Sequence, residues 1–308
     1  MNVLISNAIA RSMVVSTNAP ERLPGQVEWA AATGYPMGSR VTRTSTQRVY
    51  RAVYAVPDTV GPPEEDIATN QLPYWTDVGA MNQMAMFDSQ VRTQTVGPTG
   101  DLVVELQPGP VTDIWLANVT NAVSVRVEVL NKPGGVLVYD QTRSMGGRRT
   151  TGWFAYWYGP FVLAGDAVFS GIPAFRNCQV KITFETTGVA STGMAALGKI
   201  ENWGCTEWGV DAGYNNYSAR NLNSTWGPTE GTGGEVTKDI DYRIFVKPKD
   251  APRVNDSIKE AMRRPAVYLP SGKPEFEGIR ILGQAIQANM GYPQPNYVPL
   301  DITVREFL

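Results

Sequence analysis

The sequence predicts an all-β protein, and three observations support that prediction. The 308-residue chain has few charged residues (18%), a high aromatic content (10%) and many turn formers (30 Gly and 22 Pro). Short segments that alternate apolar and polar residues recur between clusters of Pro, Gly and Asn. This pattern is typical of short strands joined by turns. We expect a small three-stranded β-module, a jelly-roll-like β-sandwich, and a C-terminal docking region of strands and irregular structure with one short helix.

The first two predicted parts occupy residues 1–26 and 27–80. Residues 1–26 are an N-terminal extension whose strand candidate, NVLIS, we expect to pair with a partner's sheet edge or to be held by neighbouring residues. Residues 27–80 form the small module. Its strands are predicted in GSRVTRT, QRVYRAVYAV and YWTDVG, and a proline-rich loop, PDTVGPPEEDIATNQLP, connects the last two.

The other two parts occupy residues 88–190 and 191–308. The β-sandwich, residues 88–190, takes its strands from DLVVELQ, DIWLANV, AVSVRVEVL, GVLVYDQ, FVLAG and CQVKITFE. In the C-terminal region, DIDYRIFV, GIRILGQ and LDITVREF read as strands. NDSIKEAMRR reads as the helix, with Asn255 or Asp256 as its N-cap and Pro265 just beyond its end.

Composition excludes several classes of function. The chain has no histidine, which removes Ser-His-Asp and Cys-His catalysis and His-ligated zinc. Its net charge is −2 and it has no long basic run, so we expect no nucleic-acid partner. No apolar stretch is long enough for a membrane span, and no motif indicates a cofactor or a metal. Two cysteines are too few for a disulfide scaffold, and we expect Cys178 to be a buried free thiol.

One group of residues gives the N-terminal module a family resemblance. Its members are spaced through residues 29–75: Trp29, Tyr35, Gly38, Val41, Tyr50, Ala52 and Trp75. This spacing resembles that of type 3 chitin- and cellulose-binding modules. The resemblance implies a small β-core and sugar contacts from exposed aromatic rings, for which the candidates are Trp29, Tyr35, Tyr50, Tyr54 and Trp75. The exposed aromatic pair expected soon after Tyr50 is reduced to Tyr54, so a core role and a glycan-binding role both stay open.

Longer segments give the chain a second resemblance. PYWTDVGAMNQMAMFDSQVRTQT, GCTEWGVDAGYNNYSARNLNSTWGP, DIDYRIFV and the closing FEGIRILGQAIQ…VPLDITVREF are similar to segments of tailed-bacteriophage virion proteins. The resemblance covers about residues 27–308 and implies a non-enzymatic structural component of the tail, baseplate or neck and collar. It also implies a homo-oligomer with tail, portal or fibre subunits as partners. The N-terminus lacks the features of a signal peptide, which fits assembly into a virion in the host cytoplasm.

An aromatic run in the predicted sandwich is the candidate subunit interface. WFAYWYGPF follows the arginine-bearing turn GGRR, and its rings either alternate between the core and a subunit contact or line a groove. The candidate interface residues are Trp153, Phe154, Tyr156, Trp157, Tyr158, Arg148 and Arg149. Two alternative functions stay open. The first is a glycan-binding decoration or host-receptor-binding protein of the virion. The second is a polysaccharide depolymerase, whose two carboxyl groups the sequence does not identify.

Overall fold

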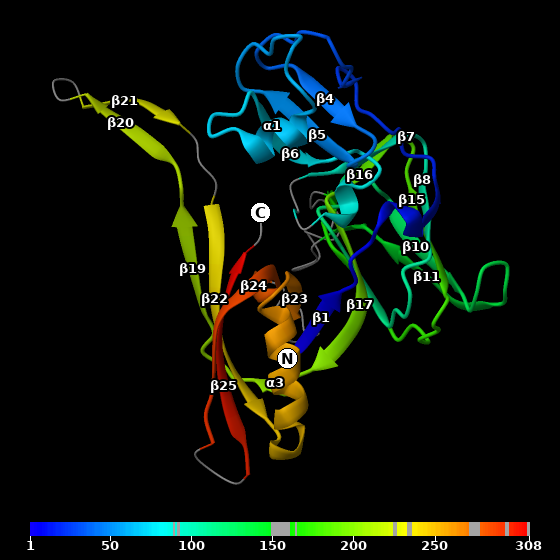
Figure 1. Ribbon diagram of the computed structural model, residues 1–308. Coiled ribbons are helices and arrows are strands. Elements are labelled where there is room, and N and C mark those ends of the chain that lie inside the picture. Colours follow the sequence, from blue (N-terminus) through cyan, green and yellow to red (C-terminus); the bar gives the residue numbers. More distant parts are fainter. Residues whose placement is uncertain are drawn as a thin grey trace. The chain divides into compact units, whose positions relative to one another are not determined.

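The computed structural model describes the chain apart from residues 89, 91–92, 149–160, 164, 224–226, 233–235, 271–277, 293–295 and 307–308. The side chains of residues 147–148, 161–163, 219–223 and 227–232 are likewise not described. Strands account for 49% of the structure and helices for 11%, which confirms the predicted all-β class (Figure 1). The chain divides into two compact units. One is Asn7–Ala195, and the other joins Met1–Ser6 to Ala196–Leu308.

The small module contains a four-stranded sheet, with strands in chain order. They are β3 (Val27–Glu28), β4 (Arg40–Arg43), β5 (Arg48–Ala52) and β6 (Trp75–Ala80). β3 runs parallel to β4, and the other neighbouring strands are antiparallel. The sequence predicts three of these strands. The fourth, β3, has two residues, too few to show an alternation of apolar and polar side chains.

A helix lies within the segment that the sequence predicts as a proline-rich loop. α1 (Pro63–Thr69) begins with a proline, and three acidic residues follow in its first turn. The fixed φ of proline suits the first helical turn, and acidic side chains there interact favourably with the helix dipole. The carboxylate of the buried Asp66 accepts hydrogen bonds from the backbone N–H groups of Tyr74 (2.7 Å) and Trp75 (3.1 Å). These bonds tie α1 to the start of β6.

The second part of the Asn7–Ala195 unit is a sandwich of curled antiparallel sheets, as the sequence predicts (Figure 1). Its five-stranded sheet has the order β11 (Leu137–Ser144), β10 (Ser124–Leu130), β15 (Gln179–Glu185), β8 (Leu102–Leu106) and β2 (Val14–Thr17). The shorter pairs are β9 (Asp113–Ala117) with β14 (Ala167–Ser170), β7 (Thr95–Thr99) with β16 (Val189–Thr192), and β12 (Gly146–Arg148) with β13 (Phe161–Leu163). Two 3₁₀ turns are η1 (Arg11–Met13) and η2 (Ala85–Phe87).

Every second residue of the central strands enters the sandwich core. The buried apolar residues of β10 and β15 are Val125, Val127, Val129, Val180, Ile182 and Phe184, all 0% exposed. A strand turns successive side chains to opposite faces, so this pattern places one face of the sheet in the core and leaves the other towards water. Cys178, just before β15, is fully buried and not in a disulfide, which confirms the predicted free thiol.

The unit formed by Met1–Ser6 and Ala196–Leu308 is built on one antiparallel sheet. Its strands run in the order β17 (Met194–Asn202), β1 (Asn2–Ser6), β23 (Ala266–Leu269), β24 (Ile281–Met290), β25 (Val298–Glu306), β22 (Val236–Val246) and β18 (Cys205–Thr206). β19 (Asp211–Asn216) also pairs with β22, and β20 (Ala219–Asn223) pairs with β21 (Gly227–Thr232). The predicted strand NVLIS is therefore an internal strand of this sheet, held on both sides by its own chain.

The helix predicted at NDSIKEAMRR begins several residues earlier than the sequence indicates. α3 (Ala251–Ala261) follows the turn η3 (Pro248–Asp250), and its N-cap is Asp250 rather than Asn255 or Asp256. The prediction of the N-cap was wrong because a proline, here Pro252, is tolerated in the first helical turn. Buried residues at helical spacing pack this helix on the sheet: Ala251, Val254, Ile258 and Ala261.

Candidate functional site

Three of the five predicted glycan-binding residues lie in the core of the small module. Tyr35, Tyr50 and Trp75 are 8%, 4% and 0% exposed. The rings of Tyr35 and Trp75 meet edge-on with their centroids 5.4 Å apart, and the Tyr35 hydroxyl accepts a hydrogen bond from the backbone N–H of Ala30 (2.8 Å). Rings enclosed in this way stabilise the module and offer little surface to a sugar. Sugar binding requires exposed aromatic rings that lie in one plane, and these three rings are buried.

The other two predicted glycan-binding residues are more accessible. Trp29 is half-buried, and the guanidinium of Arg43 lies 4.7 Å from its ring centroid. Arg43 is held there by an ion pair with Glu64 of α1, with Nη2 2.7 Å from Oε1. Tyr54 is 53% exposed. A sugar-binding surface on this module would therefore depend on Tyr54 and on the uncovered part of Trp29, and that role stays a prediction.

The predicted interface residues fall almost wholly outside the described part of the chain. Trp153, Phe154, Tyr156, Trp157, Tyr158 and Arg149 lie within residues 149–160. Arg148 is the last residue of β12, where its backbone pairs with Phe161 of β13, but its side chain is not among those described. The role of this aromatic run stays a prediction.

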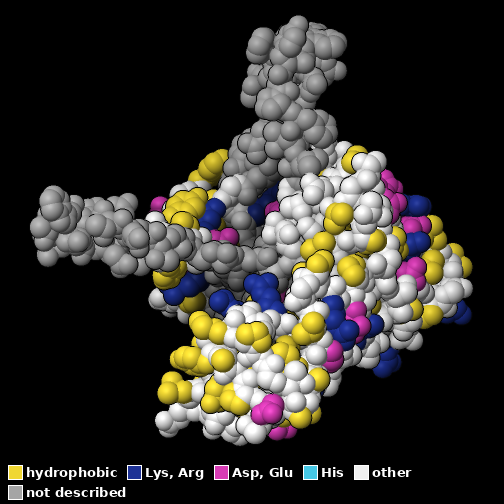
Figure 2. All heavy atoms as spheres, turned by 90° about the horizontal axis from the view of Figure 1, so that it is seen from above, with side chains coloured by type: hydrophobic (Ala, Val, Ile, Leu, Met, Phe, Trp, Pro, Cys, Tyr) yellow, Lys and Arg dark blue, Asp and Glu magenta, His cyan; other side chains and the backbone are white. Residues whose placement is uncertain are grey.

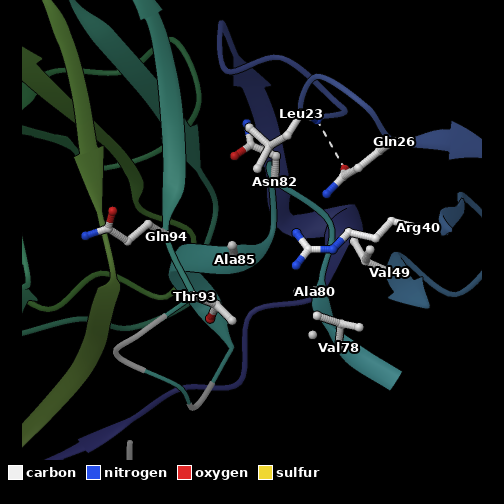
Figure 3. Close-up of a pocket in the computed structure, with 11 residues that line it drawn as sticks. Leu23, Gln26, Arg40, Val49, Val78, Ala80, Asn82, Ala85, Thr93 and Gln94 are labelled. Atoms are coloured by element: carbon white, nitrogen blue, oxygen red, sulfur yellow. Dashed lines mark hydrogen bonds between the residues drawn. The ribbon is translucent and has the colours of Figure 1, made fainter. Parts of the chain in front are cut away.

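A pocket of about 200 Å³ lies against the face of the module sheet opposite its core (Figure 3). The sheet contributes Arg40 from β4, Val49 from β5 and residues 78–80 from β6. The remaining walls come from segments outside the sheet: Leu23, Gln26, Asn82, Ala85, Thr93 and Gln94. Polar groups and apolar side chains are thus mixed around one small space, which is the usual composition of a small-molecule site.

Hydrogen bonds fix the walls that lie outside the sheet. The buried Asn82 donates through Nδ2 to the carbonyl oxygens of Pro20 (2.7 Å) and Val96 (2.9 Å), and its Oδ1 accepts from Val96 N (2.8 Å). Gln94 accepts through Oε1 from the hydroxyl of Ser191 in the sandwich (3.0 Å). Both side chains hold the pocket wall in place.

Arg40 is the cation of the pocket, and Figure 3 shows its guanidinium projecting into the space between the walls. Arg51 lies directly opposite Arg40 across the β4–β5 ladder, so both side chains point to the same face of the sheet. Neither arginine forms an ion pair within the described part of the chain. By contrast, three other arginines form ion pairs with acidic residues of the module: Arg22 with Glu28, Arg43 with Glu64, and Arg48 with Asp77.

Asp88 lies beside Gly79, which is one of the residues that line the pocket. Burial raises the pKa of the Asp88 carboxyl, although it accepts hydrogen bonds from the hydroxyl of Thr93 (2.6 Å) and from the backbone N–H of Gln90 (2.9 Å). Gly79 has φ +142°, and a Cβ at this position would lie 3.1 Å from a methyl carbon of Thr93. Glycine therefore lets the segment that carries Thr93 approach the sheet closely.

No pattern in the sequence indicates this pocket, because its lining residues come from several short segments that match no motif. Among the residues that the structure describes, no group of three or more Cys, Asp or Glu is placed to hold a metal ion. None of the described helices is long and apolar enough to cross a membrane.

The surface seen in Figure 2 mixes charged side chains of both signs with small groups of hydrophobic side chains. The most exposed large aromatic side chains among the described residues lie in the unit that contains Ala196–Leu308: Trp208 (76%), Tyr292 (69%), Tyr214 (68%) and Tyr217 (60%). Comparisons of the chain with protein-family models, with curated proteins and with solved structures found no match.

Proposed function

We propose that the chain is a structural component of a tailed-phage virion. In this role it assembles with further copies of itself and with neighbouring tail, portal or fibre proteins. The observation that carries the proposal is strand β19, an exposed sheet edge in the unit that contains Ala196–Leu308. The resemblance of the sequence to virion proteins supplies the biological setting for that edge.

All six residues of β19 are exposed, and β22 is its one hydrogen-bonded strand partner in the described part of the chain. The unpaired groups of an edge strand are a template for pairing with another chain, and soluble proteins usually protect such edges with Lys, Pro or bulges. The sequence of β19, DAGYNN, contains neither Lys nor Pro. Its edge is therefore suited to pairing.

The face of β22 that carries its core residues also continues past the region that its own unit covers, where Lys238 lies on it with its ammonium 5.7 Å from the ring centroid of Tyr214 in β19. Ile240, Tyr242 and Ile244 point into the core beneath α3. By the two-residue period of a strand, Val236 lies on the same face, and so does Tyr214 of β19, which pairs with Lys238. Val236 and Tyr214 are 50% and 68% exposed, so a partner that covers this end would bury an aromatic ring and an aliphatic side chain.

A second copy of the chain fits this edge. Two copies of β19 paired antiparallel in register would place Asp211 opposite Asn216 and Gly213 opposite Tyr214. No two like charges then face each other, which avoids the repulsion that disfavours many strand pairs. Such a contact is self-complementary, as required for two identical subunits.

One of the segments that resemble virion proteins, PYWTDVGAMNQMAMFDSQVRTQT, lies in the Asn7–Ala195 unit, whereas the others contribute strands to this same sheet. GCTEWGVDAGYNNYSARNLNSTWGP spans β18 to β20, DIDYRIFV lies in β22, and the closing segments contain β24 and β25. β24, β25 and β22 are consecutive neighbours, and β19 is hydrogen-bonded to β22. Three of the four segments thus contribute strands to the sheet that bears the exposed edge.

Sedimentation velocity on the purified full chain tests the assembly role. We expect a concentration-dependent oligomer, and we expect Tyr214→Asp to raise its dissociation constant by about 30-fold or more, as for an interface hot spot of 2 kcal/mol. Tyr54→Asp is the matched control, because Tyr54 is a similarly exposed ring (53%) in the small module. A monomer at every concentration, or equal effects of the two variants, would contradict the proposed role of β19.

Mass spectrometry of purified particles tests the virion setting. We expect peptides of this chain in the particle at a fixed ratio to tail proteins, and flanking genes that encode portal, tail-tube or fibre proteins. A chain that oligomerises through β19 but is missing from particles would retain the assembly role and overturn the virion setting.

A further inference from the structure

We propose that the Arg40 pocket binds a small carboxylate-bearing ligand about the size of a single sugar acid. The inference concerns the Asn7–Ala195 unit and does not depend on the assembly role proposed for β19. It rests on an arginine without an acidic partner, on the mixed polar and apolar walls, and on the volume of the space.

Arg40 supplies the group that would recognise the ligand. A guanidinium presents N–H donors in a planar fork that matches the two oxygens of a carboxylate. Arg51 lies directly opposite on the same face, and like charges in that position destabilise a strand pair. An anion bound at Arg40 would offset this repulsion, as Glu64 and Asp77 do for Arg43 and Arg48, which also lie opposite each other on β4 and β5.

The walls complement a carboxylate that is attached to a small polar body. Gln26 accepts a hydrogen bond through Oε1 from the backbone N–H of Leu23 (3.1 Å), and its Nε2 points towards Arg40 (Figure 3). The Thr93 hydroxyl donates to Asp88 (2.6 Å), which leaves its oxygen lone pairs as acceptors. Apolar contacts come from four other side chains: Leu23, Val49, Val78 and Ala85.

The volume limits the size of the ligand. Sites for drug-sized molecules usually measure about 300–1,000 Å³, whereas this pocket measures about 200 Å³. It can therefore enclose one sugar ring or a smaller acid, and a longer molecule would extend into solvent. One arginine and a few hydrogen bonds in such a space predict weak binding, with a dissociation constant on the order of millimolar.

A nitrogen-15 NMR titration of the full chain tests the proposal. The probes are sodium glucuronate, sodium acetate, neutral glucose, and sodium chloride at the same ionic strength. The observed signals are the Arg40 side-chain Nε–H and the backbone amides of Gly79 and Ala80, which line the pocket. We expect saturable shifts with glucuronate, weaker saturable shifts with acetate, and none with glucose. Equally strong binding of acetate would also support the proposal, since the carboxylate alone would then suffice.

Three variants distinguish binding in the pocket from nonspecific attraction of an anion to basic residues of the surface. Arg40→Gln should raise the dissociation constant for glucuronate at least about tenfold, as measured from the backbone amide signals of Gly79 and Ala80. Val78→Phe keeps the charge but fills the space, and it should also abolish saturation; Val78 is 38% exposed, so the fold should tolerate the larger ring. Arg176→Gln removes an exposed arginine elsewhere in the same unit and should leave binding unchanged. Shifts that sodium chloride or glucose reproduces, or binding that survives Val78→Phe, would overturn the proposal.

Discussion

Replacing Asp66 with alanine should lower the free energy of local unfolding of the small module by about 2–4 kcal/mol. The Asp66 side chain is buried, and its carboxylate accepts hydrogen bonds from the backbone N–H groups of Tyr74 and Trp75. Alanine leaves both donors without this partner. An unsatisfied buried donor costs about 1–3 kcal/mol, and the partly solvated Tyr74 amide lies towards the low end of that range. α1 would also lose its hydrogen-bonded link to β6.

Hydrogen exchange read by mass spectrometry measures this change locally. A loss of 2–4 kcal/mol corresponds to about 30- to 700-fold faster exchange of amides in β6, at 1.4 kcal/mol per factor of ten. Asp58→Ala is the control, because Asp58 is an exposed carboxylate of the same module. Exchange in Asp66→Ala within about threefold of the wild type would refute the reasoning, since it would mean that water satisfies both amides at little cost.

Three further predictions concern other parts of the chain. The pKa of Asp239 lies below its ordinary 3.8, chiefly because of the hydrogen bond from Arg305. The ionised Asp239 therefore stabilises the fold above pH 3.8, and this stabilisation is lost as the pH falls through the lowered pKa. In acid denaturation, Asp239→Asn should lose less stability than the wild type between pH 3.8 and the lowered pKa. Cys205 is exposed whereas burial raises the pKa of the Cys178 thiol, so a thiol reagent should modify one cysteine rapidly in the native protein and the second only after unfolding. Val3→Asp places a charge in the core beneath the sheet and should lower the free energy of unfolding of its unit by several kcal/mol. In limited proteolysis, the Ala196–Leu308 part should then be cleaved early while the Asn7–Ala195 unit resists, and equal resistance of both parts would contradict the prediction.

The all-β class and most regular strands were predictable from the sequence, because alternating side chains reflect one buried face. DIDYRIFV illustrates this, since its apolar residues at every second position enter the core as β22. Shorter or less apolar elements were missed. β19 carries no buried residue to mark it, and α1 is a single short helix in a segment rich in proline. Both are held by contacts with other elements, β19 by pairing with β22 and α1 by the hydrogen bonds of Asp66 to β6 and its neighbour Tyr74.

The module aromatics and the pocket differ in how far sequence could identify them. The spacing of Trp29, Tyr35, Tyr50 and Trp75 indicated a small β-core, and three of these rings are in that core. Spacing does not reveal which side of a strand faces water, so it could not separate core rings from sugar-binding rings. The pocket around Arg40 is formed by residues 23–94 from separate turns and strands, and only the folded chain brings them together.

The position of β1 has a consequence for how the protein is made. This strand leaves the ribosome well before its two neighbours, β17 and β23, whose pairing residues are 198–202 and 266–269. The intervening Asn7–Ala195 unit can fold during that interval, whereas NVLIS has no strand to pair with until most of the chain has been synthesised. Contacts between residues so far apart in sequence form slowly. We therefore expect the closing of this sheet to be the slowest folding step, and the one that most depends on a chaperone to shield an unpaired apolar strand.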